Sequence, residues 1–518
     1  MNTGLLQQTY TEKLWNGAVT ALKQNIVPIL GGLICGLLAY MYAFTNNLVN
    51  MDNLEYLFSK GATYESGRWG LALLSVLFPD YSMSWIYGIL SLMLLTAAAC
   101  VCIRLLSIRN RALQFLLAGA TVTFPSQIAT ITYYYTAAPY GIAFLMSVLA
   151  VRYVRRGDRK GYLSALVLSV LSSGIYQAYI SITAAMLVVA LIRDVITAEE
   201  DTKRLLQKGF AYVGFLVLAL GSYWLITKAV WYATGIGIGS YANVALQFRV
   251  ADIPKNIGKA YVYFYRILFR SHQLVITGVQ TFLAHYFMLI FIGIELILWA
   301  FANRKPGRIL LLLFLVAILP LAINCMYLFT SERMVHLLML YAFVALYYLA
   351  AVVLESGQFA RYVREGLKKY RVLLYDIVLW CIAVILVSNI YFANRAYLNL
   401  QLQYERTYHF TSSLLTTLQN TPGYTGDAKV ALVELGGSRM FLQEEFLDLN
   451  PIYGLRGMTP NTYSVEKLFA YYNGVEITLV EGEELERIRA LPEVEAMAPY
   501  PGHGCVKRID GIFVVKLS

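Results

Sequence analysis

Charged side chains are scarce in this sequence, and the motif through which many enzymes hold a nucleotide is missing. Asp, Glu, Lys and Arg make up 14% of the 518 residues, whereas a soluble domain has about 25%. No P-loop occurs, and Gly235, Gly237 and Gly239 lack the strand–turn–helix context of a nucleotide fingerprint. These absences exclude ATP as the direct energy source and argue against an ordinary soluble enzyme.

Patterns typical of metal and disulfide sites are also missing. The six cysteines and five histidines include no CxxC pair and no ligand spacing, so neither a zinc site nor a disulfide framework is expected. No cleavable signal peptide is expected either. The first apolar run is long enough to span a bilayer, and it lacks a small-residue cleavage site.

Long apolar runs are what the sequence has in abundance. Apolar residues make up 58% of the chain, more than the roughly 45–50% of a soluble domain. Runs of about 20 such residues predict transmembrane helices. We predict eleven spans, at about residues 25–44, 85–106, 113–131, 139–154, two within 162–196, 210–228, 281–302, 309–324, 335–354 and 372–392. The predicted fold class is a polytopic α-helical membrane protein.

The stretch 162–196 is interpreted as two short helices. A single helix of this length would extend about 50 Å, which is too long for one crossing. Basic residues lie on both sides of the stretch, so both of its ends should face the cytoplasm. A break near Ser172–Gln177 is therefore required.

The excess of basic residues follows the expected membrane topology. The net charge is +11, and Lys and Arg cluster in short loops between alternate spans. By the positive-inside rule, the amino terminus lies inside the cell and the carboxyl terminus outside. The same placement argues against a nucleic-acid partner, because the basic residues form no continuous footprint.

Three parts follow one another along the chain. Residues 1–24 predict an amphipathic helix on the cytoplasmic surface, and residues 25–392 form the transmembrane domain. Residues 393–518 predict an extracytoplasmic α/β domain. Its expected helices cover 398–418, 464–472 and 483–490, and its expected strands cover 429–435 and 511–517.

The first predicted outer loop carries two carboxylates, Asp52 and Glu55. They are three residues apart and would share one face of a helix. Asp52 directly follows the first span, so its carboxylate would lie at headgroup level, where it could deprotonate a sugar hydroxyl. Two alternatives are open: Asp52 could help to hold a divalent cation, Mg²⁺ or Mn²⁺, or cap a helix that begins near Asn53.

The same loop ends in Gly67-Arg68-Trp69-Gly70. The forked donors of Arg68 suit a phosphate, and Trp69 offers a face for a sugar; the pair could instead grip lipid headgroups. Further candidates for sugar binding are Tyr134, Tyr176 and Gln177. Further candidates for phosphate binding are Arg333, Arg266 and Arg270, although Arg266 and Arg270 also suit a solvated helix face.

Three motifs together resemble the bacterial Gtr-type glucosyltransferases, which decorate surface polysaccharides such as O-antigen. The first is the acidic residue of the first outer loop followed by Gly67-Arg68-Trp69. The second is Gly174-Ile175-Tyr176-Gln177-Ala178 between two short helices. The third is Tyr500-Pro501-Gly502-His503-Gly504 with the segments 509–511 and 514–517 after it. The likeness runs through nearly the whole chain in order and topology.

This resemblance implies a GT-C-type fold in the bacterial plasma membrane. It also implies a donor in which a hexose, with glucose the first candidate, is carried on a polyprenyl phosphate. The acceptor would be a surface polysaccharide or glycolipid. Asp52 matches the family's catalytic base. Here its neighbours are Met51 and Asn53 and the next acid is Glu55, whereas some relatives have adjacent acids, so which carboxylate acts stays open. The alternative function is transport or flipping of a lipid-linked saccharide, for which internal repeats and midplane charges would be typical.

Overall fold

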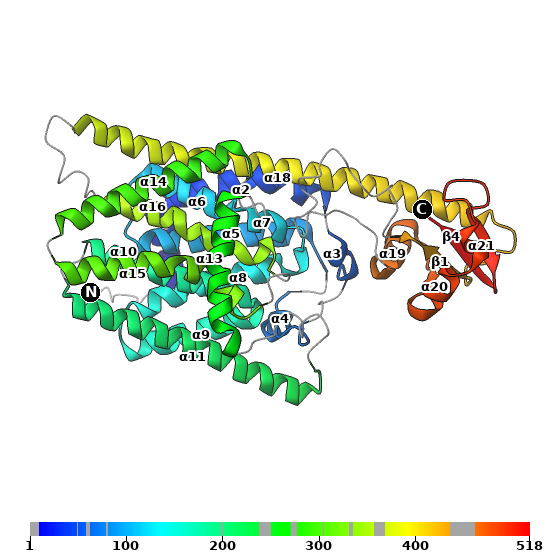
Figure 1. Cartoon of the computed structure of the whole chain (residues 1–518), viewed down its shortest axis with the longest axis horizontal. Helices are drawn as coiled ribbons and strands as arrows, with labels where there is room; N and C mark the ends of the chain where they lie inside the picture. Colours follow the sequence, from blue (N-terminus) through cyan, green and yellow to red (C-terminus); the bar gives the residue numbers. More distant parts are fainter. Residues whose placement is uncertain are drawn as a thin grey trace, which may run out of the picture.

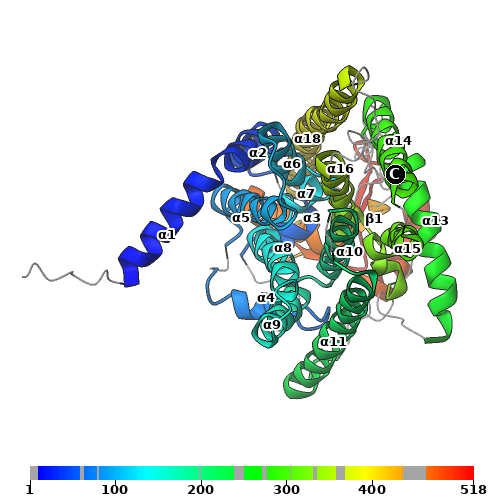
Figure 2. The same ribbon diagram turned by 90° about the vertical axis from the view of Figure 1, so that its left-hand side faces the viewer.

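The computed structural model describes residues 10–48, 50–58, 63–78, 81–197, 200–237, 250–270, 277–303, 305–330, 335–356, 368–435 and 462–518. Most of its helices run lengthwise in one bundle, and a small sheet with short helices lies beyond one end of that bundle (Figure 1). Seen along the bundle, α1 (Tyr10–Gln24) projects sideways from it (Figure 2).

The bundle has thirteen described helical segments, of which α6 and α7 together form one span and η6 and α16 another. They are α2 (Ile26–Asn46), α5 (Ser84–Leu105), α6 (Arg111–Val122), α7 (Pro125–Thr130), α8 (Tyr134–Val154), α9 (Arg159–Ile175), α10 (Ile180–Thr197), α11 (Thr202–Thr234), α14 (Val279–Ala302), α15 (Pro306–Ile323), η6 (Leu337–Val344), α16 (Ala345–Ser356) and α18 (Lys368–Gln419). The helix α13 (Ile253–Phe269) lies across them (Figure 1).

Ten helical segments of the described part of the chain are long and apolar enough to cross a membrane. The sequence predicts eleven. The difference is α9, whose 17 residues extend about 26 Å, a little less than the roughly 30 Å of a bilayer core. The predicted break between the two short helices is present: α9 ends at Ile175, and α10 begins at Ile180 after a short turn at η1 (Gln177–Tyr179).

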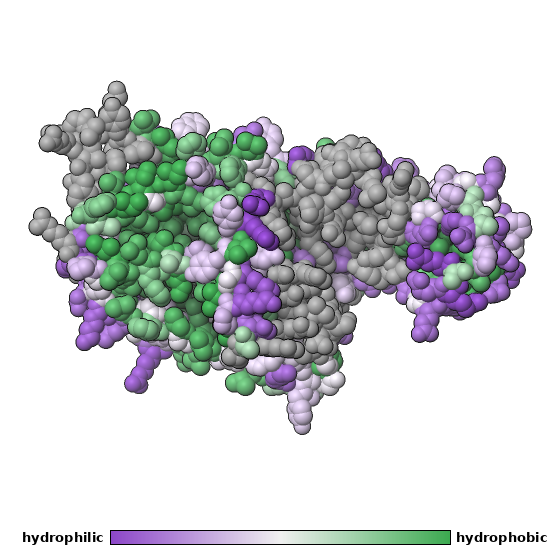
Figure 3. Space-filling view, in the orientation of Figure 1, coloured by the Kyte–Doolittle hydropathy of each residue, from purple (hydrophilic) through white to green (hydrophobic). Residues whose placement is uncertain are grey.

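The outer surface of the bundle is apolar, as a lipid-facing surface must be. Along α14 the large exposed side chains recur at intervals of four and three residues, so they form one stripe. They are Leu283, Phe287, Ile290, Ile294, Ile297 and Phe301. Figure 3 shows the bundle as largely hydrophobic on this side and the small sheet region as largely hydrophilic. The chain is a polytopic helical membrane protein.

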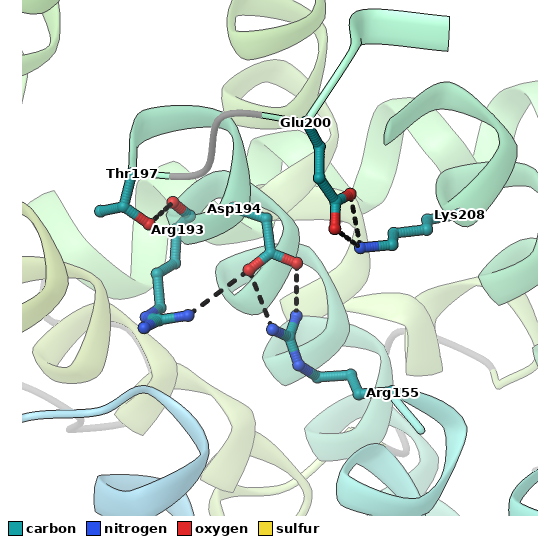
Figure 4. A network of polar contacts seen from close by, with 6 residues as sticks. All are labelled: Arg155, Arg193, Asp194, Thr197, Glu200 and Lys208. Atoms are coloured by element: carbon teal, nitrogen blue, oxygen red, sulfur yellow. Dashed lines mark hydrogen bonds and ion pairs between the residues drawn. The ribbon is translucent and has the colours of Figure 1, made fainter. Parts of the chain in front are cut away.

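Ion pairs hold helix ends together at the basic end of the bundle (Figure 4). Arg155, directly after α8, donates through both terminal nitrogens to Asp194 of α10, each at 2.9 Å. Arg193 lies 3.5 Å from the same carboxylate, and Lys208 of α11 lies 2.6 Å from Glu200. The other end of α8, at Tyr134, lies on the side of the first loop.

One helix, α18, runs for 52 residues from the bundle to the small sheet (Figure 1). The sequence predicts a span that ends near residue 392 and a separate helix from 398. The structure corrects this division, because the helix continues unbroken across residue 393. Its last turns lose the apolar outer surface of a span but keep a buried face that includes Phe410, Leu414 and Leu418.

The carboxyl-terminal region is a four-stranded sheet in the order β2-β1-β4-β3. The strands are β1 (Lys429–Val433), β2 (Thr478–Leu479), β3 (Val506–Ile509) and β4 (Ile512–Lys516). β1 is parallel to β2 and to β4, and β3 is antiparallel to β4. The end of α18 packs on one face, and α20 (Gly482–Arg489) and α21 (Pro492–Glu495) pack on the other. We call this unit, from residue 420 onward, the C-terminal domain.

Candidate active site

A cavity of about 440 Å³ opens where the first loop meets the bundle. Its lining includes charged and aromatic side chains, and it brings together residues from segments far apart in the sequence. Its lining residues are Asp52, Glu55, Tyr56, Ser66, Arg68, Tyr133, Tyr135, Thr136, Tyr140, Tyr176, His336, Leu338 and Met339. Four of the residues singled out in the sequence thus share one cavity: Asp52, Glu55, Arg68 and Tyr176.

Asp52 lies in the first turn of a short helix, α3 (Met51–Glu55), and does not cap it. The cap is Asn50, whose side-chain oxygen accepts a hydrogen bond of 2.8 Å from the N–H of Asn53. Asn50 also donates to the hydroxyl of Thr132 at 2.8 Å. The capping role left open for Asp52 is therefore filled by another residue, and the Asp52 carboxylate is left to line the cavity.

The other side of α3 is also anchored, through Asn53. Its side-chain oxygen accepts hydrogen bonds from Ser82 at 2.8 Å and from the N–H of Tyr135 at 3.2 Å. Asn53 is fully buried, so these bonds form away from competing water. They set the position of α3, and with it the positions of Asp52 and Glu55.

Arg68 is held by a tight turn in the loop before α4 (Trp69–Leu74). Gly67 has φ +70, and the site of a Cβ there would lie 2.8 Å from the hydroxyl of Tyr223, so glycine is required. Gln177 donates to the carbonyl of Ser66 at 2.7 Å, and Tyr223 donates to the carbonyl of Gly67 at 3.1 Å. Gln177 therefore binds the loop and is not among the residues that line the cavity; sugar binding by Gln177 stays a prediction.

Trp69 is also held by contacts within the protein. Its indole N–H donates to Thr227 at 3.2 Å, and its ring packs so closely on Gly174 that a Cβ there would lie 2.6 Å from it. A Cβ at Gly70 would lie 2.8 Å from the backbone of Gly174. The two family motifs, 67–70 and 174–177, thus dock on each other, and Trp69 is not among the residues that line the cavity.

Aromatic rings form the wall behind Arg68. Its guanidinium lies 5.4 Å from the centre of the Tyr176 ring, a cation–π distance. Tyr176 stacks on Tyr140 with ring centres 4.3 Å apart, and Tyr56 and Tyr135 are 5.1 Å apart. Tyrosine rings offer apolar faces to a sugar ring and hydroxyls to its oxygens. Chemically, the cavity combines carboxylates, a guanidinium and an aromatic wall.

Glu55 differs from Asp52 in its surroundings. Burial raises the pKa of the Glu55 carboxyl; Lys467 opposes this rise, and Glu466 adds to it. Its Oε2 is buried and accepts no hydrogen bond from any described residue. The protonated form of Glu55 therefore persists to higher pH than in an exposed glutamate.

The remaining predicted residues lie elsewhere. Tyr134 is fully buried and donates to the carbonyl of Ala43 at 2.9 Å. On α13, Arg266 is exposed and stacks over Tyr263 at 5.3 Å, and Arg270 is exposed at the end of that helix. Arg333 lies outside the described residues. Neighbours from other segments, which the sequence does not reveal, determine these positions.

Several lining residues carry no signal in the sequence. His336 precedes η6 and shows no ligand spacing, and Tyr140 lies within a predicted span. Tyr133 and Tyr135 flank Tyr134, the residue that the sequence singles out; Tyr135 lies in α8, and Tyr133 directly precedes it.

A complete metal site is not found in the part of the chain that the structure describes, where no three His, Cys, Asp or Glu side chains are placed to hold an ion. Two carboxylates alone would leave most of the coordination of Mg²⁺ to water and to a substrate phosphate.

The family model of the glucosyl transferase GtrII matches residues 41–354, more than half of the 518 residues. The chain belongs to this family. The family that the motifs suggest is therefore confirmed, and membership implies a glucosyltransferase, an enzyme with a sugar donor and an acceptor. No curated protein and no solved structure matches the chain.

The matched region of this GtrII-family protein includes every residue that lines the cavity. It ends within α16 and leaves out α18 and the C-terminal domain. Membership also favours the enzyme over the transporter that the sequence left as an alternative. The third motif, at 500–504, lies in the C-terminal domain, where the Tyr500 hydroxyl donates to Ser413 of α18 at 2.7 Å.

Proposed function

We propose that this protein transfers glucose from a polyprenyl-phosphate carrier to a polysaccharide or glycolipid of the cell surface, at the outer face of the bacterial plasma membrane. The observation that carries the proposal is the cavity in which Asp52 and Arg68 meet an aromatic wall. A carboxylate beside a guanidinium suits a reaction in which a hydroxyl loses a proton and a phosphate leaves.

The proposed orientation is supported by the distribution of charge. Basic residues gather at the end of the bundle where α5, α8 and α10 finish, and Lys and Arg favour the cytoplasmic side. The cavity is near the other end, at the start of α8 and the end of α9. The amino terminus would then lie inside, and the cavity and the C-terminal domain outside.

Each lining group has a place in an inverting transfer. The hydroxyl oxygen of the acceptor attacks C1 of the glucose while Asp52 takes the hydroxyl proton. The bond between C1 and the phosphate oxygen breaks, and its electron pair leaves with the polyprenyl phosphate. Arg68 stabilises the charge that grows on this phosphate, and Tyr176 and its stacked neighbour Tyr140 hold the sugar.

Incubation of the purified protein with polyprenyl-phosphate-glucose and candidate surface glycans tests this function, with mass analysis of the products. We expect the glycan to gain one hexose and free polyprenyl phosphate to appear. A nucleotide-linked glucose serves as the matched control donor and should give no product. Transfer from the nucleotide sugar, or none from the lipid-linked one, would contradict the proposed donor.

A further inference from the structure

The C-terminal domain contacts α3, the helix that carries Asp52. Leu468, at the end of α19 (Thr462–Leu468), and Leu54 of α3 are both buried in one small apolar cluster, with 1% and 0% of their surface exposed. Tyr404 and Tyr472 complete the cluster. Next to it, Phe58 and Tyr471 pack edge to face at 5.0 Å.

This contact is attached to the bundle through a rigid element. The turns of α18 beyond the bundle carry Tyr404 and then Phe410, Leu414 and Leu418, which pack into the core of the C-terminal domain. A continuous helix of this kind fixes the distance between the bundle and the domain. The domain therefore reaches α3 from a fixed position.

α3 needs such support because it has five residues, about one and a half turns. A helix this short does not form stably on its own. Asn50 and Asn53 tie it to the bundle, and Leu54 contacts Leu468 of the C-terminal domain. Among the described residues, Leu468 is the only fully buried partner of Leu54 in this cluster, so its loss would leave a cavity beside α3.

We propose that the C-terminal domain helps to position the catalytic base. In this proposal Leu468 is a positioning residue that holds α3 and thereby places the Asp52 carboxylate. This inference rests on the function proposed above. It assigns the domain a role in placing the base, beyond any role in binding the acceptor.

The test compares Leu468→Ala with Val494→Ala in the full-length protein. Val494 has 1% of its surface exposed and packs on the other face of the sheet, away from α3, so it controls for a cavity in the same domain. We expect Leu468→Ala to speed hydrogen exchange at the backbone amides of α3 and to lower kcat by up to about 100-fold. The KM for the donor should change little, because the cavity walls outside α3 stay in place.

Two further variants keep the test decisive. Leu54→Ala removes the contact from the α3 side and leaves the domain intact, so it should reproduce both effects. Leu468→Met keeps the apolar contact and should restore kcat. Unchanged exchange in α3, or equal effects of Val494→Ala, would overturn the inference. If the wild type transfers no glucose, the proposed function fails, and the exchange measurement still decides whether Leu468 holds α3.

Discussion

Asp52 lines the cavity and does not cap α3, because Asn50 fills the capping position. From the sequence the two roles cannot be separated, since Asp is both a common cap and a common base. The hydrogen bonds of Asn50 exclude the capping role, and the role of Asp52 as base is a proposal that the kinetics described below test. Trp69 and Gln177, which the sequence suggests as sugar-binding residues, do not line the cavity. Their hydrogen-bond partners, Thr227 and Ser66, lie far away in sequence.

Replacement of Arg68 should affect the chemical step. Arg68→Gln removes the charge that meets the leaving phosphate, and we expect kcat to fall by about 10²–10³-fold. Arg68→Lys keeps the charge but loses the fork and should retain part of the activity. Arg266→Gln is the matched control, because Arg266 does not line the cavity, and should leave kcat close to wild type. Steady-state kinetics check this, and a larger loss in Arg266→Gln would point to a donor site on α13 instead.

Glu55 should make donor binding depend on pH. Its raised pKa keeps the carboxyl neutral over a wider range, and on ionisation it adds negative charge to a cavity that receives a phosphate. The donor KM should therefore rise as the pH passes the pKa of Glu55. The groups that face it are Asp52, Tyr56, Arg68, Tyr135 and His336 of the cavity and Lys467 and Glu466 of α19.

Two charge neutralisations on α19 test the sign of this effect. Lys467→Gln removes an opposing positive charge, so the rise in KM should move to higher pH. Glu466→Gln removes a negative charge and should move it to lower pH. Lys507→Gln, on the exposed surface of β3, changes the net charge equally and should move nothing. Shifts in the same direction for both α19 variants would refute the explanation.

At the scale of elements, the site depends on the close approach of α4 and α9. Gly70 and Gly174 let the two backbones meet, and Trp69 fills the space beside them. Both motifs are visible in the sequence, but nothing in the sequence shows that they touch. Likewise, α18 could not be delimited from hydropathy, because the helix continues where its apolar outer surface ends.

A methyl group at this contact should therefore destabilise the bundle. Gly174→Ala places a Cβ 2.6 Å from the ring of Trp69, and such overpacking costs about 1–3 kcal/mol. Gly221→Ala on α11 meets nothing within 4 Å and serves as the control. Thermal unfolding in detergent should show a lower Tm for the first variant alone. Equal Tm values for the two variants would mean that α4 and α9 move apart to admit the methyl group without loss of stability.

At the scale of the whole molecule, the sequence predicts the membrane class, the alternation of spans and the strands β1 and β4. These features follow from runs of apolar residues and from the alternation of apolar and polar residues, which are properties of the local sequence. The cavity, the contact of α19 with α3 and the strand order follow from long-range packing. They required the three-dimensional structure.

The proposed orientation can be measured in intact cells with a membrane-impermeant thiol reagent. His503→Cys in the C-terminal domain and Lys160→Cys at the basic end of the bundle are both exposed positions, whereas five of the six native cysteines are buried. We expect the reagent to label position 503 in intact cells and position 160 after permeabilisation, with the wild type as background. The reverse pattern would place the cavity on the cytoplasmic side.

The most direct test of the central claim is glucose transfer by purified Asp52→Asn beside wild type and Glu55→Gln, at saturating donor. If Asp52 is the base, its replacement should lower kcat by about 10²–10⁴-fold, with the Tm unchanged, while Glu55→Gln keeps measurable transfer. Full activity of folded Asp52→Asn would contradict the assignment of the base.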